Sequence, residues 1–297
     1  ALSRFRIIET ERATYFFSDN HHLAYDGFSI AVFWHTLDRL YRGKKIFQDY
    51  WSQYLAEYEA ITNSNAYDEC RKWYEERYNP ASYSTSPLPD FPEGQYPNAQ
   101  GTITHKLDID AGRIKTTRYE FFNAAALLAI AAYNNNPNIM LTWTDNNRQD
   151  KKFLHTVGAL IRDLPIAVRL EGMTIGGLFG SVKGQMNSCA EHSCYPYTLT
   201  LDDELVCSFY QGRLYETPQY VEIFDGEVDM RRNSPGSQNI LDIEIEEHDD
   251  GLEVLLDYAA HRYTQDSMKR FAEIYVRIVH CLIDADPDTD AVRFLEV

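Results

Sequence analysis

The sequence predicts an α/β or α+β fold, and three observations support this class. Apolar residues make up 44% of the 297-residue chain and charged residues 25%, a composition typical of ordinary globular proteins. Segments rich in β-branched and aromatic residues interleave with segments of helical periodicity along the whole chain. The chain contains no internal repeat and no low-complexity tract. This order argues against both a helical bundle and a β-sandwich.

The first hundred residues begin with two predicted strands. β-branched and aromatic residues fill 5–8 and 13–17, and the polar residues 9–12 between them suit a hairpin turn. Helices are expected over about 29–41, 49–60 and 66–77. Residues 79–100 contain five prolines and no periodicity, which predicts a linker long enough to join two lobes.

The remaining two thirds of the chain alternate strands with helices. Strands are expected over 101–109, 139–144, 161–170, 205–210, 240–246 and 252–259. Helices are expected over about 123–133, 174–188 and 264–284. The last two strands are expected to pair as a hairpin across 249–251, whereas the acidic stretch 211–238 shows no clear periodicity.

The net charge of −17 and the pI near 4.9 exclude several partner classes. Binding to phosphate backbones and to anionic membranes depends on Lys and Arg, so neither partner is expected. No apolar stretch is long enough for a membrane span, and no signal peptide opens the chain. The five cysteines are irregularly spaced, without the pairs of a zinc site or a disulfide framework. The sequence therefore predicts a soluble cytoplasmic protein with reduced, mostly buried thiols.

The strongest chemical signal is His21-His22-x-x-x-Asp26-Gly27, which lies between a predicted strand and a predicted helix. Such a junction exposes side chains where catalytic groups are commonly found. A histidine is the natural general base near neutral pH. An aspartate four residues further on can fix the loop through an ion pair, and the glycine permits a tight turn or close approach of a substrate. The competing interpretation is a turn that carries two solvated histidines.

This motif resembles the HHxxxDG signature of condensation domains in nonribosomal peptide synthetases, which belong to the chloramphenicol-acetyltransferase-like superfamily. Further matches follow the family's order and spacing from residue 1 to about residue 290. They are Leu2-Ser3-Arg4-Phe5, Asp26-Gly27-Phe28-Ser29, 37–43, Asp49-Tyr50-Trp51, Lys72-Trp73-Tyr74, Asn147-Arg148, 157–165 and 192–197. The last three resemble the family's NR turn, its VGxFxNTLP strand and its HxxxPF turn.

The resemblance implies a chloramphenicol-acetyltransferase-like fold of two lobes, each a mixed sheet flanked by helices. Residues 1–94 would form the remaining part of the N-terminal lobe, with the motif and the inter-lobe linker, and residues 95–297 the C-terminal lobe. A complete member of the family carries a long further stretch before the motif, so the N-terminal lobe is expected to be incomplete. The start at Ala1 then predicts an exposed apolar sheet face or edge.

The implied activity is amide formation between a donor acyl or peptidyl thioester and an acceptor amine. Each substrate would arrive on the 4′-phosphopantetheine arm of a carrier protein, and the two arms would meet in a tunnel between the lobes. The resemblance implies that His22 deprotonates or positions the attacking amine and that His21 packs or hydrogen-bonds within the loop. Asp26 would hold the loop, and Gly27 would line the tunnel with its backbone. Stabilisation of the tetrahedral intermediate would matter as much as proton transfer.

The resemblance also implies the partners. They are an upstream donor and a downstream acceptor peptidyl carrier protein and an adjacent adenylation domain, with no cofactor or metal held by the domain itself. Because carrier proteins are typically acidic, a chain of charge −17 would need a local basic patch to receive them. Epimerisation, acyl transfer from coenzyme A and a catalytically silent docking module of the same fold are the alternatives. Heterocyclisation is disfavoured, since those domains carry aspartate in place of the histidines.

Two departures from the family pattern affect the site. Arg162-Asp163 stands where the family has Asn-Thr, which puts substrate contacts near that strand in question. An arginine from the segment expected before Ala1 would be the natural partner of Asp26, and Arg4 or Arg6 in the neighbouring strand would be its replacement.

Ser29 and Arg148 are two further candidates for substrate binding. Ser29 would bond to a substrate carbonyl or, as the favoured reading, cap the helix that follows the motif. Arg148 would contact substrate or, as the favoured reading, close an ion pair within the protein.

Three other groups of residues are interpreted as structural. Glu244 and Glu246 alternate along a strand, which fits a solvated sheet edge better than a metal site. His192 and Cys194 lie too close in sequence for nucleophile–base geometry and are expected to pack. The tyrosine-rich stretch 50–78 is expected to pack within a lobe.

Overall fold

The computed structural model describes residues 2–91, 99–201, 205–211, 239–248 and 251–297. Contacts divide the chain into two compact units. The first unit comprises Ala1–Asn63, Asn146–Arg162 and Leu214–Arg231, and the second comprises Ser64–Asp145, Asp163–Arg213 and Arg232–Val297. The lobe boundary expected at residue 94 stays a prediction, and this division groups residues 64–91 with the second unit. The aperiodic stretch 212–238 and the hairpin tip 249–250 lie outside the described residues.

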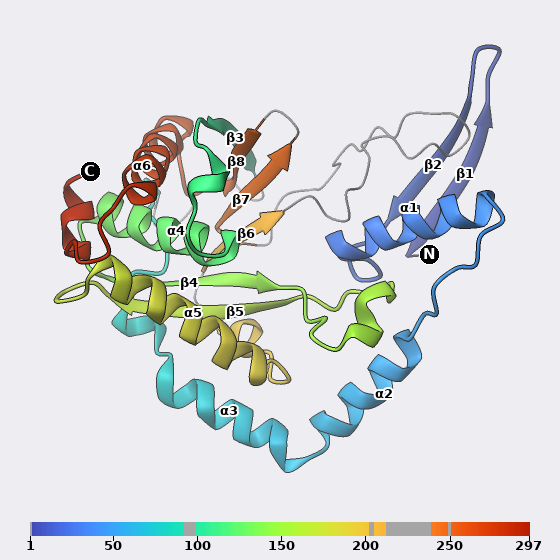
Figure 1. Ribbon diagram of the computed structural model, residues 1–297, viewed down its shortest axis with the longest axis horizontal. Helices are drawn as coiled ribbons and strands as arrows, with labels where there is room; N and C mark the ends of the chain where they lie inside the picture. Colours follow the sequence, from blue (N-terminus) through green and yellow to red (C-terminus); the bar gives the residue numbers. More distant parts are fainter. Residues whose placement is uncertain (1, 92–98, 202–204, 212–238, 249–250) are drawn as a thin grey trace. The chain divides into compact units, whose positions relative to one another are not determined.

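The first unit begins with the predicted hairpin. Strands β1 (Ser3–Glu9) and β2 (Thr14–Asn20) pair antiparallel (Figure 1), and Thr10 closes the turn through bonds of its N–H and hydroxyl to the carbonyl of Ala13. Helices α1 (Gly27–Tyr41) and α2 (Trp51–Thr62) follow, close to their predicted ranges. A single 3-10 turn over Lys151–His155 belongs to the same unit.

Aromatic rings join these elements. Phe5 of β1 stacks on Phe33 of α1, with 5.4 Å between ring centroids, and Phe16 of β2 meets Trp34 edge to face. The hairpin nevertheless exposes much of its apolar surface, and Ile7 is 66% accessible to solvent. The apolar exposure expected near the start of the chain is therefore present on this hairpin.

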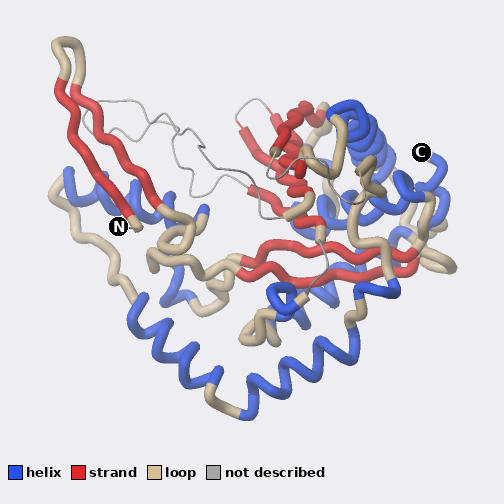
Figure 2. The backbone as a smooth tube through the Cα atoms, turned by 180° about the vertical axis from the view of Figure 1, so that it is seen from behind, coloured by secondary structure: helices blue, strands red, loops and turns tan. Residues whose placement is uncertain are grey.

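The second unit contains one mixed sheet of six strands in the order β3-β8-β7-β6-β4-β5. The strands are β3 (Gln100–Leu107), β4 (Asn138–Asp145), β5 (Arg162–Arg169), β6 (Val206–Gln211), β7 (Leu241–His248) and β8 (Gly251–Ala259). Strand β8 pairs antiparallel with both β3 and β7, whereas β6 pairs parallel with β7 and β4. Seen from behind, β4 and β5 lie side by side (Figure 2). The helices are α3 (Asn65–Arg77), α4 (Arg118–Asn134), α5 (Ile175–Glu191) and α6 (Gln265–Ile283).

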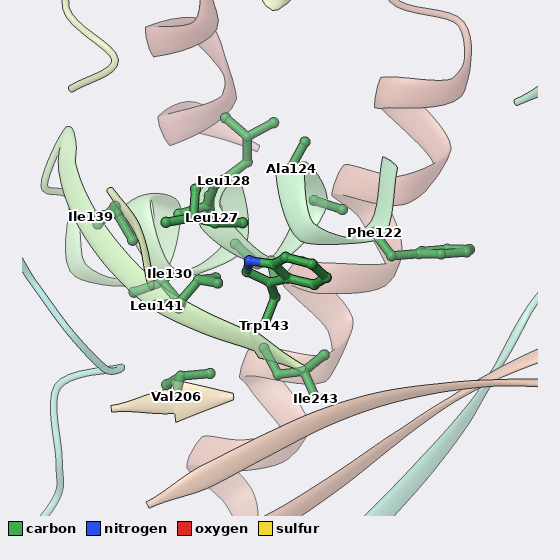
Figure 3. Packing of buried hydrophobic residues seen from close by; sticks show 14 of the residues in the cluster. Phe122, Ala124, Leu127, Leu128, Ile130, Ile139, Leu141, Trp143, Val206 and Ile243 are labelled. Atoms are coloured by element: carbon green, nitrogen blue, oxygen red, sulfur yellow. The ribbon is translucent and has the colours of Figure 1, made fainter. Parts of the chain in front are cut away.

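The core of the second unit lies between the sheet and helix α4, which contacts both α5 and α6. Leu127 and Leu128 of this helix belong to the same buried cluster as Trp143 of β4 and Ile243 of β7, and Figure 3 shows all four. All side chains from Phe121 to Ala131 are buried, so helix α4 is enclosed on every side. This explains why the sequence shows no polar face there.

Two predictions fail in this unit. Helix α4 starts at Arg118, five residues before the predicted start, because Thr117 and Glu120 form a capping box there. The first turn of the helix is polar, so the apolar pattern begins only after it. Glu244 is only 2% exposed, and β7 is an interior strand between β6 and β8, so the predicted solvated edge is wrong. All five cysteines are free thiols, and three of them are buried, as expected. No helix of the described residues is long and apolar enough to cross a membrane.

Candidate functional site

The histidine loop connects the end of β2 to the start of α1. His21 accepts a bond from the backbone N–H of Leu23 at its Nδ1 (3.1 Å), and its carbonyl accepts from the N–H of Ala24 (2.9 Å). His21 thus hydrogen-bonds within the loop, as expected. His22 is exposed. The loop folds on itself through His21 and presents His22 to solvent.

Asp26 caps the helix that follows. Its Oδ1 accepts the N–H of Ser29 at 2.7 Å, so Asp26 is the N-cap and Gly27 is the first residue of α1. The predicted capping by Ser29 is therefore wrong, because the helix begins two residues earlier than expected and an aspartate already stands at the cap position. The cap fixes the end of the loop that carries His22.

The partner of Asp26 is Arg148. Arg148 Nη1 donates to Asp26 Oδ2 at 2.9 Å and Nη2 to Oδ1 at 3.1 Å, and both side chains are 0% exposed. Such a bidentate geometry is the strongest that an arginine and a carboxylate make. The predicted alternatives, Arg4 and Arg6, are exposed on β1, so the expectation that one of them replaces the partner is wrong. The ion pair expected of Arg148 is confirmed.

Residues 146–162, here called the strap, carry Arg148 and wrap the same carboxylate. The N–H of Leu160 donates to Asp26 Oδ2 at 2.9 Å. Ser29 Oγ accepts the N–H of Gly158 at 2.9 Å and lies 2.7 Å from both Asp26 Oδ1 and the carbonyl of Gly158, its two possible acceptors. A Cβ atom at Gly158 would lie 2.3 Å from the ring of Trp51, so only glycine fits there. The strap and the start of α1 thus share one buried network.

A second set of contacts ties the strap to α2. The hydroxyl of Tyr54 accepts bonds from Asn147 at 2.9 Å and from Arg162 at 3.0 Å, and burial raises the pKa of this phenol. Arg162 also donates to the carbonyl of Ile161 at 2.9 Å. The Tyr54 ring belongs to a small buried cluster with Phe153 and Leu160. Arg162, which departs from the family pattern, therefore serves to hold the strap.

A third contact joins the strap to the segment after α1. His155 stacks on Phe47 with 3.6 Å between ring centroids and 8° between planes. Burial lowers the pKa of His155, and the nearby His35 and Arg39 lower it further. The neutral imidazole is consequently the form that this packing favours.

The other candidate residues lie in the second unit. Asp163 accepts the hydroxyl proton of Thr144 at 2.7 Å. His192 stacks on Trp73 with 4.1 Å between ring centroids, so the packing expected of it is confirmed. Tyr74 and Tyr78 are buried, as expected for packing, and each hydroxyl bonds to an atom of Cys189. No group of three or more His, Cys, Asp or Glu in the described ranges is placed to hold a metal ion.

Chemically, the first unit offers an exposed imidazole, that of His22, on a short loop with both ends fixed. An imidazole can take up and release a proton near neutral pH. The adjoining carboxylate is fully engaged by Arg148, Ser29 and Leu160, so it holds the loop and has no free oxygen for substrate.

Comparisons with known proteins agree on one family. Residues 1–291 match the sequence model of the family described as Condensation domain. The hybrid PKS-NRPS synthetase iliA of Neonectria sp. (strain DH2) is 23% identical over 304 residues, which cover 91% of this chain. The chain spans 7% of the length of that synthetase.

Solved structures share the fold. The condensation domain of the Monacolin K polyketide synthase MokA superposes with a TM-score of 0.74 at 17% identity, covering 98% of this chain and 74% of that one. The epimerization domain from the third module of tyrocidine synthetase B gives a TM-score of 0.71 at 15% identity, covering 95% and 72%.

Proposed function

The chain belongs to the condensation-domain family, and from this premise we propose that it forms an amide bond between two carrier-bound substrates. The donor is an acyl or peptidyl thioester and the acceptor an aminoacyl group, each on a 4′-phosphopantetheine arm. The carriers and an adjacent adenylation domain are the partners that this proposal requires. The domain itself needs no cofactor for this chemistry.

One observation carries the proposal. His22 is an exposed imidazole whose loop is fixed by the buried Asp26–Arg148 pair. A bare turn with two solvated histidines, the competing interpretation, would not need a bidentate buried ion pair and a strap to hold it. A general base must stay within hydrogen-bond reach of the proton that it moves, and such fixation supplies this.

The proposed reaction balances without a co-reactant. The amine nitrogen of the acceptor attacks the thioester carbonyl of the donor, and the carbon–sulfur bond breaks as the amide forms. His22 takes the proton that the amine loses and returns it to the departing thiolate. His21 shapes the loop, Asp26 holds it, and the backbone of Gly27 borders the space in front of His22.

Ser29 and Arg148 are candidate substrate ligands, but both side chains are buried, which favours a structural role for them. The hydroxyl of Ser29 lies within hydrogen-bond distance of Asp26 and Gly158, and the guanidinium of Arg148 donates hydrogen bonds to Asp26 and to backbone carbonyls. We therefore propose that both are positioning residues. Their effect on catalysis would pass through the orientation of the histidine loop.

The test is a two-carrier assay with the synthetase that contains this chain. A donor carrier loaded with an acyl group and an acceptor carrier loaded with an amino acid are mixed, and mass spectrometry follows the acceptor carrier. We expect its mass to increase by the acyl group. His22→Ala should lower the rate by about 10²–10⁴-fold, the usual worth of a general base.

The control is His280→Ala, which removes an exposed histidine from α6 and should leave the rate unchanged. An inverted stereocentre without acyl transfer would show that the domain catalyses epimerisation and not condensation. Tight carrier binding without any product would indicate a silent docking module. Equal rates for the His22→Ala variant and the unchanged protein would remove His22 from the mechanism.

A further inference from the structure

Two segments of this acidic protein, 1–63 and 146–162, carry a small excess of positive charge. The segments 1–63 and 146–162 contain eleven Lys and Arg against nine Asp and Glu, whereas the whole chain contains 28 against 45. The rest of the chain therefore carries all of the excess negative charge. A negatively charged partner meets less repulsion at these two segments than at the rest of the chain.

The end of helix α1 is built as a closed turn. The N–H of Lys44 donates to the carbonyl of Arg39 at 2.8 Å, and Gly43 reverses the chain with φ of +64°, a conformation that favours glycine. Arg39 Nε then donates to the carbonyl of Lys45 at 2.8 Å. These bonds tie the first and last residues of the turn together, so its side chains project from a fixed backbone.

Residues 40–46, here called the docking turn, combine basic and apolar side chains on the surface. Lys44 and Lys45 are exposed, and neither forms an ion pair with any residue that the structure describes. Leu40, Tyr41 and Ile46 are exposed large hydrophobic residues beside them. Protein–protein interfaces combine an apolar core with a polar rim.

The neighbouring charges do not cancel this surface. Asp38 is the acidic residue on the adjoining turn of α1, and it is already paired with Arg42 at 2.8 Å. Arg39 sits over the ring of Phe47, 4.8 Å from its centroid, and His155 stacks on the same ring. The docking turn is thereby anchored to the strap, the segment that also holds Asp26.

We propose that the docking turn receives the acidic surface of a carrier protein, an inference that rests on the proposed function. Charge complementarity selects an acidic partner over a basic or neutral one. Helix α1 links the two sites, because it begins beside the histidine loop and ends at the docking turn. Its 15 residues span about 22 Å, which is the distance that a 4′-phosphopantetheine arm would have to cover in this arrangement. A carrier held at one end of α1 can thus deliver its thioester towards His22 at the other.

The decisive variant is Lys44→Glu with Lys45→Glu in the full synthetase. We expect the KM for the holo carrier protein to rise about tenfold with kcat unchanged, because reversing surface charge mainly slows association. The rise should shrink as salt is added. The matched control is Lys72→Glu with Lys269→Glu, two exposed lysines of α3 and α6 that give the same change of net charge.

Carrier-free substrates separate this inference from the proposed function. With an N-acetylcysteamine thioester as donor, the Lys44→Glu, Lys45→Glu variant should form amide as fast as the unchanged protein. Equal KM values for the carrier in this variant and in the control would overturn the docking turn while leaving condensation intact. Absence of amide from either donor with the unchanged protein would overturn the proposed function, and the docking turn with it.

Discussion

Replacing Arg148 with methionine should destabilise the protein more than any exposed arginine change. Methionine keeps most of the side-chain volume and removes the charge, so the Asp26 carboxylate stays buried with only neutral donors from Ser29 and Leu160. Both members of the pair are 0% exposed, so water cannot take the place of the guanidinium. Breaking a buried ion pair from one side costs about 3–5 kcal/mol. We expect the free energy of unfolding to fall by this amount.

Urea denaturation followed by tryptophan fluorescence measures this loss, since Trp34 and Trp51 report on the first unit. The matched control is Arg71→Met on α3. Arg71 pairs with Asp68 and Glu75 but is 40% exposed, so this change should cost at most about 1 kcal/mol. A cost for Arg148→Met no larger than that of the control would refute the central role of the buried pair.

A double variant keeps the prediction testable if Arg148→Met alone prevents folding. Asp26→Asn together with Arg148→Met leaves no buried charge, so it should recover part of the lost stability. The double-mutant cycle should give a coupling free energy well above the few tenths of a kcal/mol found for independent sites. Additive effects of the two changes would show that the carboxylate and guanidinium stabilise the fold separately.

Two further predictions concern the strap. Gly158→Ala should lower the free energy of unfolding by about 1–3 kcal/mol, because the added Cβ would overlap the ring of Trp51. The control is Gly180→Ala on α5, where the added Cβ meets open space and the change should be neutral or stabilising. Equal melting temperatures for the two variants would exclude the close packing of Gly158 against Trp51. Because the pKa of His155 is lowered in the folded state, the unfolded chain takes up its proton first, and stability should fall as pH drops through the ordinary histidine range near 6.5. His155→Gln should flatten this decline between pH 7 and 5 in urea titrations, and an unchanged slope would rule out His155 as its source.

Local patterns were sufficient to predict most elements of the fold. Helix α6 presents one apolar stripe and is found within one residue of its predicted range. Helix α4 has no such stripe because it is buried all round, and its first turn is polar, so apolar periodicity does not predict its start. The Thr117–Glu120 capping box is a signal in the sequence that would have found that start.

The interpretation of Glu244 shows a limit of a different kind. Alternation of charged and apolar residues usually indicates a strand with one face in water. Strand β7, however, is an interior strand between β6 and β8, and Glu244 is buried despite the alternation. Strand order within a sheet depends on pairings between distant segments, which a pattern along one segment does not contain.

The candidate site likewise has a part that the sequence predicts and a part that depends on the fold. The motif identified His21, His22 and Asp26 from seven neighbouring residues, but Arg148 stands 122 positions after Asp26, and only the fold brings them together. The strap also gives a structural role to Arg162, which stands where the motif that this segment resembles has asparagine. Its guanidinium donates hydrogen bonds to the hydroxyl of Tyr54 and to the carbonyl of Ile161, so Arg162 links the strap to α2. The backbone of Leu160 keeps its bond to Asp26, and the geometry behind His22 is preserved. At this position, therefore, the contact to Asp26 comes from the backbone and does not depend on which side chain residue 162 carries.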